Sequence, residues 1–537
     1  MNKKLVMLVL AAAVVLAGTV VEAAHKKDNR PDGGSLSYGE YGRPATLDPV
    51  TSNEMISLRL TELIFNGLVG INEKQEIVPE LAERWERSPD GRTYTFFLRK
   101  DVTWHPKEGE EPKPFTAEDV IFTYRIMMHP KTITPLKVRY EFIDTAEKVD
   151  EYTVKFTLKR PILNALAKFS FKVIPKHGPA NPNFLTRDDH FVQSPIGTGP
   201  YMLKNVTPER EIVLAANDNY FKGRPHLDKF TAKPFADQNI MTQALMFNAI
   251  DMIVLVNPRD IPEIQGDKRF ILQSYNALSY SFFGYNMRNP LLADKRVRKA
   301  FTHAVNRQEM LDSFFNGQGT IISGPFAPGS WAYNLDVQPI PFDAQKAIAL
   351  LQEAGFTRGA DGFMQKDGKK LTLSLKVPIE KESEAVKRVV LAFKNYLKNV
   401  GVDIKVEFKE WQAWKEDVFL EHDFDIIFAS WVFDDSADIS SLFHSGEIGA
   451  WKNNFGGYSN AEVDGLINES KLTLDHEKRR TINRKLHAVL ADENPYTFLW
   501  TLTNYAAYQK KVRRVAIHPY KFFSYADDWF VEEKDQK

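Results

Sequence analysis

Hydrophobic and polar positions alternate with two different periods along the chain, and each period predicts a different element. Apolar residues recur at helical spacing in "MISLRLTELIFNGLV" (55–69), in "DKRVRKAFTHAVNRQEMLDSFF" (294–315) and in "SEAVKRVVLAFKNYLKNVGV" (383–402). They alternate at strand spacing in "YTVKFTL" (152–158) and in "TYTFFL" (93–98), which follows a Pro-Asp-Gly turn and therefore predicts a hairpin. Thr116 and Asp119 nearly match a capping box and predict a helix start.

The region from about 370 to 431 combines both periods in the order strand, helix, strand, helix, strand. Its first helix ends at Asn399 and Gly401, which are suitable helix-stop residues. This order predicts an α/β fold. A chain of 537 residues without internal repeats exceeds the size of a single core, so we expect several lobes with short connections.

The N-terminus carries an export signal. Lys3 and Lys4 precede the apolar run "LVMLVLAAAVVLAG", which is short for a bilayer span, and small residues follow it. We expect a signal peptide over 1–23, cleaved after Ala23, and a flexible leader over 24–34; an uncleaved anchor is the alternative. The chain has no cysteine, so neither disulfides nor a lipid-modified cysteine can form. These features together indicate a periplasmic protein without a lipid anchor.

Composition and motifs favour a binding protein over an enzyme. Lys plus Arg and Asp plus Glu both total 70, so no global charge points to nucleic acid or to a membrane surface. The chain contains no HExxH, GxSxG or Walker A pattern and no dinucleotide-binding glycine pattern, and its 12 histidines are scattered. We therefore expect no catalysis, no cofactor and no metal site.

One short stretch, "SWVFDDSADISSLF" (430–443), places a large aromatic residue just ahead of two adjacent acids at the end of an expected strand. It has two interpretations. Trp431 could be a core residue beside a solvated acidic turn, or it could form a ligand pocket together with Asp434, because an ionised aspartate accepts hydrogen bonds from a buried amine.

Several stretches in a fixed order resemble one family. They are "ATLDP" (45–49), "LAERWERSPDGRTYTFFLRKDVTWHPKEGEEPKPFTAEDVIFTY" (81–124), "PIGTGPY" (195–201), "YNMRNPLLADKRVRKAFTHAVNR" (285–307) and "SWVFDDSAD" (430–438). From about residue 35 to 530 the chain resembles family 5 of the extracellular solute-binding proteins, the dipeptide- and oligopeptide-binding receptors of ABC importers.

The resemblance implies a periplasmic-binding-protein type II-like fold with two hinged lobes and an additional inserted domain. The first lobe would combine 35–69, 197–284 and 502–537, the inserted domain would span 70–196, and the second lobe would span 285–501. Ligand would lie between the lobes.

The resemblance also implies ligand-binding residues. Asp434 resembles the aspartate that takes a peptide's α-amino group, with Asp435 as the fallback acceptor, and Trp431 resembles a tryptophan that walls a side-chain pocket. The further candidates, by analogy alone, are Phe433, Asn53, Glu54, Trp411 and Trp451; Trp411 and Trp414 could equally be core, and Trp331 could pin a loop.

Two departures from the family pattern affect specificity. Phe433 stands where relatives have a small residue, so it could narrow the first pocket, and Asp435 could favour a more cationic ligand. Near 378–381, where dipeptide-specific relatives supply an arginine, this chain reads Pro-Ile-Glu-Lys, which argues against strict dipeptide specificity.

These features lead to one main hypothesis and two alternatives. The main hypothesis is a monomeric periplasmic receptor that captures oligopeptides and delivers them to an inner-membrane ABC permease, without membrane insertion and without nucleic acid. The same fold could instead bind a metal chelate, a sugar oligomer or an opine-like compound. A secreted hydrolase or a chaperone-like peptide holder is the alternative from another class.

Overall fold

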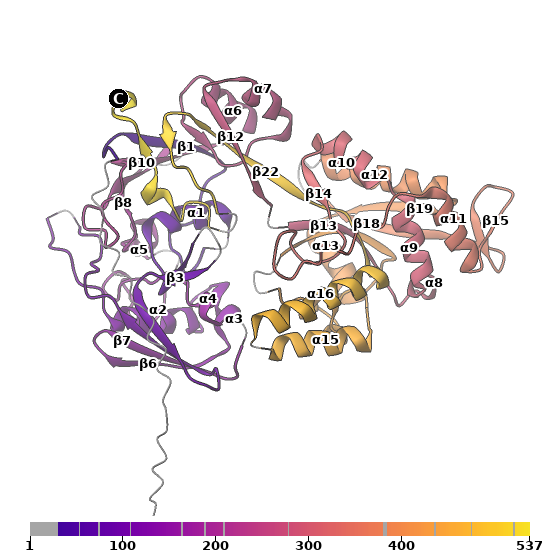
Figure 1. Ribbon diagram of the computed structural model, residues 1–537, viewed down its shortest axis with the longest axis horizontal. Helices are drawn as coiled ribbons and strands as arrows, with labels where there is room; N and C mark the ends of the chain where they lie inside the picture. Colours follow the sequence, from indigo (N-terminus) through magenta and orange to yellow (C-terminus); the bar gives the residue numbers. More distant parts are fainter. Residues whose placement is uncertain are drawn as a thin grey trace, which may run out of the picture.

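The computed structural model describes residues 30–52, 54–72, 76–107, 109–162, 165–186, 189–207, 210–277, 279–379, 384–433, 437–473, 475–518 and 521–536. They form two halves joined by a narrow waist (Figure 1). The expected signal peptide (1–23) lies outside these residues. Within them, no helix is long and apolar enough to cross a membrane.

The first half is built on a large mixed sheet. Its strands, in spatial order, are β12 (Phe270–Asn276), β22 (Trp500–Gln509), β11 (Met252–Ile253), β1 (Ser35–Tyr41), β10 (Lys229–Phe235), β9 (Glu211–Ala216) and β8 (Tyr201–Thr207). The helices α1 (Met55–Ile64), α6 (Gln238–Met246) and α7 (Ile261–Gly266) belong to this half, and β23 (Val512–Arg513) pairs with β24 (Phe530–Val531). The helical pattern after residue 54 is thereby confirmed as α1.

The segment expected as an inserted domain forms its own antiparallel sheet. Its strands are β4 (Ala82–Arg87), β5 (Thr93–Leu98), β7 (Thr153–Leu158) and β6 (Ile143–Asp150). Arg87 pairs with Tyr94, so the hairpin prediction is confirmed. The capping box is confirmed as well, because the Thr116 N–H donates to Asp119 Oδ2 at 3.0 Å. The other elements are α2 (Ala117–Met128), α3 (Leu136–Tyr140), α4 (Ala165–Lys168), α5 (His190–Gln193), β2 (Val69–Ile71) and β3 (Ile77–Pro79).

One continuous hydrophobic core joins these two sheets. Tyr38 and Phe230 of the large sheet and Phe96 of the small one all belong to it. The stretch "PIGTGPY" (195–201) connects the small sheet back to β8 of the large one, and its backbone packs against the end of α1. The Gly199 N–H donates to the Ile64 carbonyl at 2.8 Å, and a Cβ at Gly199 would lie 2.5 Å from the carbonyl oxygen of Leu63. The glycine is therefore required by a close backbone approach.

The second half is built on a five-stranded sheet in the order β19 (Asp403–Lys409), β18 (Thr372–Pro378), β20 (Ile426–Val432), β13 (Ser279–Tyr285) and β21 (Tyr496–Phe498). β18 pairs in parallel with both β19 and β20, which confirms the alternating pattern of 370–431. The intervening helices are α12 (Glu384–Asn399) and α13 (Trp411–Lys415), which continues as a π-helix over Glu416–Glu421.

Helices cover both faces of this sheet. Phe283 of β13 stacks on Phe393 at 3.7 Å and its neighbour Phe282 stacks on Tyr496 at 4.2 Å, so alternate residues enter separate cores. The remaining elements are α8 (Pro290–Ala293), α9 (Lys295–Ala304), α10 (Arg307–Phe315), β14 (Gly319–Ile321), α11 (Ala344–Glu353), β15 (Thr357–Arg358), β16 (Met364–Lys366), β17 (Lys369–Lys370), α14 (Ser440–Phe443), α15 (Ala461–Leu472) and α16 (His476–Glu493).

The chain crosses the waist between β12 and β13 and again at β22 (Figure 1). The first three residues of β22 pair with β14 and the rest pair with β12, so this strand reaches into both halves. β13 belongs to the second sheet, although we expected 197–284 in the first lobe, and the expected boundary at 501/502 falls inside β22. The alternation of hydrophobic and polar residues continues without a break along a strand that passes from one half to the other. The sequence alone therefore does not show at which residue the strand crosses.

Candidate functional site

A cavity of about 530 Å³ opens on the second half beside the waist. We call it the aromatic cavity. Side chains from β20, α12, α13 and the start of β22 form part of its wall. Eight of the wall residues are aromatic: Phe315, Trp411, Trp414, Phe419, Phe428, Trp431, Phe455 and Trp500. Concave sites of this size with a mostly apolar wall are typical of small-ligand binding.

Trp431 stands in the wall of the cavity near the end of β20. Its ring stacks on Phe455 at 6.2 Å and on Phe282 at 6.3 Å. Phe282 and Phe455 are fully buried. The indole is therefore held from behind by core residues, while it contributes to the surface of the cavity.

Trp411 and Trp414 stack on each other at 5.4 Å with an interplanar angle of 13°, as their helical spacing allows. Trp414 is only 3% exposed and its Nε1–H donates to the Lys376 carbonyl at 3.3 Å. Trp411 is 48% exposed. Both residues line the cavity: Trp414 is largely buried in the core and stacks against Trp411, whose side chain is half exposed.

Lys376 and Lys409 pair with two aspartates next to the cavity, and Lys409 Nζ lies 2.6 Å from Asp417 Oδ2. Lys376 Nζ lies 2.8 Å from Asp417 Oδ2 and 2.7 Å from Asp423 Oδ2. Burial lowers the pKa of Lys376, but these hydrogen bonds outweigh burial and raise the pKa above its usual value. Lys415 is the one charged side chain among the described residues of the wall, and its Nζ lies 5.7 Å from the centre of the Trp411 ring.

One edge of β20 is open beside these rings. On its β13 side the strand is paired from Ile426 to Val432. On its β18 side, pairing ends at Ile427, and no other strand among the described residues takes over. Backbone N–H and C=O groups of the end of β20 therefore face the cavity side without a ladder partner, as at the edge of a sheet.

Several sequence candidates lie away from the cavity wall. Phe433 is 5% exposed and packs against Tyr280 at 5.0 Å in the core, so it does not narrow this cavity. Glu54 caps α1 by accepting from the Ile56 N–H at 2.8 Å, which occupies its carboxylate. Trp451 is exposed in a left-handed turn, and Trp331 stacks under Arg479 at 4.7 Å.

Three candidates cannot be placed. Asn53, Asp434 and Asp435 lie outside the residues that the structure describes. Their ligand roles stay predictions from the sequence. Phe433, the residue just before the two acids, is the last described residue of that stretch, one residue beyond the end of β20.

The sequence did not reveal Phe419, Phe455 or Trp500 as cavity residues. Phe455 lies in a loop with no regular pattern, and Trp500 starts a strand that reads as core. Only their tertiary neighbours bring them to the site. The aromatic content of the chain, 12%, was the one general signal.

A buried Ser323–His487 pair resembles a nucleophile and its base, but its hydrogen bonds oppose that role. Ser323 Oγ lies 3.0 Å from His487 Nε2. His487 Nδ1 accepts from the Asn334 N–H at 2.9 Å, so the ring proton sits on Nε2 and is donated to the serine. Burial also lowers the pKa of His487 to about 4. A general base needs the opposite tautomer.

Comparison with known proteins gives consistent matches over nearly the whole chain. Residues 76–451 match the profile described as "Bacterial extracellular solute-binding proteins, family 5 Middle". The oligopeptide-binding protein AppA of Bacillus subtilis is 30% identical over 519 residues, covering 95% of this chain and 94% of AppA.

Solved structures agree with this match. AppA of Bacillus subtilis in complex with a nonapeptide has a TM-score of 0.74 at 28% identity, covering 94% of this chain and all of that one (100%). NikZ of Campylobacter jejuni in complex with Ni(L-His) has a TM-score of 0.73 at 25% identity, covering 92% and 99%. The chain belongs to family 5 of the bacterial extracellular solute-binding proteins.

Proposed function

We propose that this protein is the periplasmic receptor of an ABC importer, which captures oligopeptides at the aromatic cavity and delivers them to an inner-membrane permease. The relative with the highest identity reported above is named for oligopeptide binding, and its solved structure holds a nonapeptide. The protein acts by binding and release and carries out no chemistry of its own.

The observation that carries this proposal is the open edge of β20 beside the aromatic wall. An extended peptide added to a strand edge gains main-chain hydrogen bonds that do not depend on its sequence. Trp411 and Trp431 offer apolar area to side chains without demanding a particular partner. Together these features suit a variable peptide better than a single small molecule.

The amino end of the peptide is assigned to the acids that follow β20. Asp434 would accept hydrogen bonds from the α-amino group, and Asp435 is the fallback. The strand ends at Val432, and one residue, Phe433, separates it from the two acids in the sequence. An aligned peptide could therefore run along β20 with its amine towards these residues.

Export and organisation complete the proposal. Cleavage after Ala23 would release a soluble monomer into the periplasm, and no lipid anchor can form on a chain without cysteine. The two halves would be the hinged lobes, with 70–196 inserted in the first and with the hinge at β22 and between β12 and β13. Ligand would favour the closed arrangement because it then touches both lobes.

The test is calorimetric titration of the mature protein with a tetrapeptide and with the same peptide methylated on one central amide nitrogen. Strand addition predicts that at least one position of methylation weakens binding strongly, because it removes an N–H and adds bulk at the edge. A peptide whose affinity is unchanged by methylation at every amide would contradict the proposed binding mode.

The likeness to NikZ with bound Ni(L-His) keeps a metal chelate as the second candidate. No group of three or more metal-ligating side chains occurs among the described residues, but a chelate brings its own ligands. Thermal-shift screening of peptide mixtures against Ni(L-His) and sugar oligomers distinguishes the two, since only the true ligand class stabilises the folded protein.

A further inference from the structure

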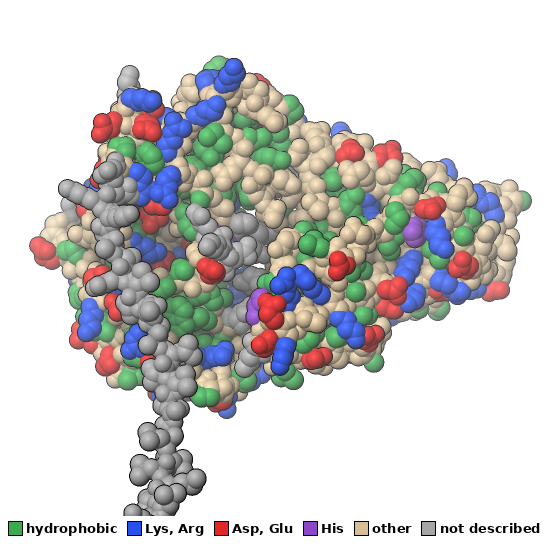
Figure 2. Space-filling model, in the orientation of Figure 1, with side chains coloured by type: hydrophobic (Ala, Val, Ile, Leu, Met, Phe, Trp, Pro, Cys, Tyr) green, Lys and Arg blue, Asp and Glu red, His purple; other side chains and the backbone are tan. Residues whose placement is uncertain are grey.

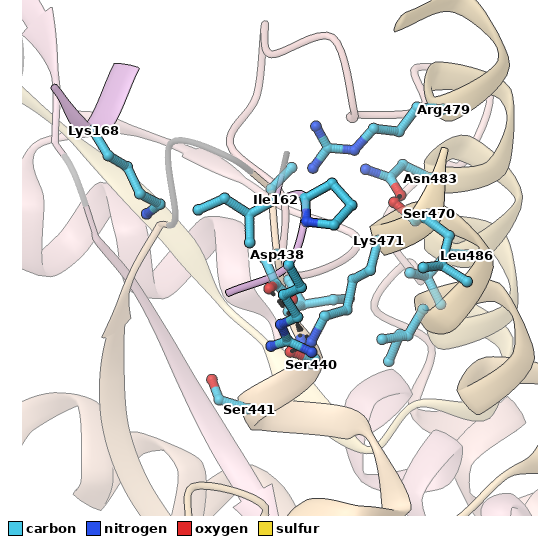
Figure 3. Close-up of a pocket in the computed structure, with 16 residues that line it drawn as sticks. Ile162, Lys168, Asp438, Ser440, Ser441, Ser470, Lys471, Arg479, Asn483 and Leu486 are labelled. Atoms are coloured by element: carbon cyan, nitrogen blue, oxygen red, sulfur yellow. Dashed lines mark hydrogen bonds and ion pairs between the residues drawn. The ribbon is translucent and has the colours of Figure 1, made fainter. Parts of the chain in front are cut away.

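A second cavity, of about 350 Å³, lies between the inserted segment and the helices α15 and α16 (Figure 3). We call it the interlobe cavity. Arg160, Ile162 and Lys168 line it from the first half, and residues 437–441 with both helices line it from the second. None of its wall residues belongs to the aromatic cavity.

The wall of the interlobe cavity is strongly basic. Four side chains are cationic, Arg160, Lys168, Lys471 and Arg479, and one is anionic, Asp438, which gives a formal charge of +3. Asp438 is already engaged, because its carboxylate accepts from the Ser440 N–H at 2.9 Å and lies 3.8 Å from Lys471 Nζ. Figure 2 shows Lys and Arg side chains at the end of α15 and α16 that borders the hollow between the halves.

A buried amide adds a directed donor. Asn483 is fully buried at 0% exposure, and its Oδ1 accepts from Ser470 Oγ at 2.6 Å. Its Nδ2 has no hydrogen-bond partner among the described residues. Figure 3 shows this nitrogen on the cavity side of the side chain, next to Arg479. A buried N–H group without an acceptor is unfavourable. A ligand oxygen in the cavity would supply the missing acceptor.

We propose that the interlobe cavity binds a carboxylate group. Asn483 Nδ2 donates to one carboxylate oxygen, and the basic side chains of both walls supply the opposite charge. Ile162 and Leu486 give the cavity an apolar part, which suits the carbon portion of an organic acid. The cationic side chains on the two walls repel each other when no anion lies between them. A bound carboxylate reduces this repulsion and therefore stabilises the arrangement in which the two halves face each other across the cavity.

The first experiment titrates the mature protein with sodium succinate by calorimetry, with sodium chloride at equal ionic strength as the blank. The variant is the pair Arg160→Gln and Lys168→Gln, which line the cavity from the first half. We expect the pair to weaken succinate binding by about tenfold or more, because a charge facing a partly buried anion is lost. The matched control Lys204→Gln, an exposed charge on β8 outside the cavity, should bind as the wild type does.

The second experiment distinguishes the source of the carboxylate. The peptides Ala-Glu-Ala and Ala-Gln-Ala differ in one carboxylate. If succinate does not bind, the peptide supplies the carboxylate when two results hold: Ala-Glu-Ala binds more tightly than Ala-Gln-Ala, and the double variant abolishes this difference. Saturable succinate binding that the double variant weakens assigns the site to a free organic acid.

The proposal fails if neither succinate nor the Glu peptide shows binding that depends on Arg160 and Lys168. It also fails if Asn483→Leu, shown to be folded by circular dichroism, binds as the wild type does whichever of these two ligands depends on Arg160 and Lys168. The succinate measurement does not depend on the proposed peptide function, so failure of one is distinguishable from failure of the other.

Discussion

Trp411→Ala should weaken peptide binding by about thirtyfold. A tryptophan side chain buries up to about 250 Å², and Trp411 is 48% exposed, which leaves roughly 120 Å² for a ligand to cover. At about 25 cal/mol per Å², complete cover is worth about 3 kcal/mol. A ligand that covers about two thirds of that area gains about 2 kcal/mol, which is about thirtyfold in Kd.

The control for this prediction is Trp451→Ala. Trp451 is 53% exposed in the same half of the molecule but lies outside the aromatic wall, so its loss should leave the Kd unchanged. Calorimetric titration of both variants with one tetrapeptide gives the comparison, and urea unfolding checks that both remain as stable as the wild type to within about 1 kcal/mol. An unchanged Kd for Trp411→Ala, or equal losses in both variants, would refute the assignment of the site.

Three further predictions concern the anchor, the pH response and the packing. Asp434→Asn should weaken binding of a peptide with a free amine by about 2 to 5 kcal/mol, and N-acetylation of the peptide should harm the wild type far more than this variant; additive losses would move the anchor to Asp435. Burial lowers the pKa of His105 to about 4, whereas an unfolded histidine titrates near 6.5. Between these two pKa values the unfolded chain binds a proton at this position that the folded chain does not. His105 alone should therefore lower the free energy of unfolding by up to about 1.4 kcal/mol per pH unit towards acid, and His105→Gln should reduce the slope by that amount in urea titrations. Gly197→Ala would place a Cβ 1.8 Å from a main-chain oxygen of α1 and should destabilise by about 3 kcal/mol in thermal unfolding, whereas Gly465→Ala, whose Cβ meets open space within α15, should not destabilise.

The local architecture was largely predictable from the sequence. The alternation of strand and helix over 370–431 appears as β18, α12, β19, α13 and β20, and the Pro-Asp-Gly hairpin appears as β4 and β5. These features depend on periodicity and turn chemistry within short stretches, which a sequence displays directly. The pairing of Trp411 with Trp414 was likewise foreseeable from helical spacing.

The tertiary arrangement of the site was not predictable. Strand alternation would place Phe433 on the same face as Trp431, but β20 ends at Val432 and Phe433 turns into the core against Tyr280. Glu54, a ligand candidate by analogy, also caps α1, because its side chain reaches the free N–H groups of the first turn. The open edge of β20 depends on where β18 diverges, which no local pattern encodes.

Native mass spectrometry of the protein purified from the periplasm of its own host tests the central claim most directly. Bound molecules are released and sequenced from the wild type, from Trp411→Ala and from Trp451→Ala. The account predicts a mixture of oligopeptides on the wild type and on Trp451→Ala, with much less on Trp411→Ala. A single non-peptide compound on all three proteins would contradict it.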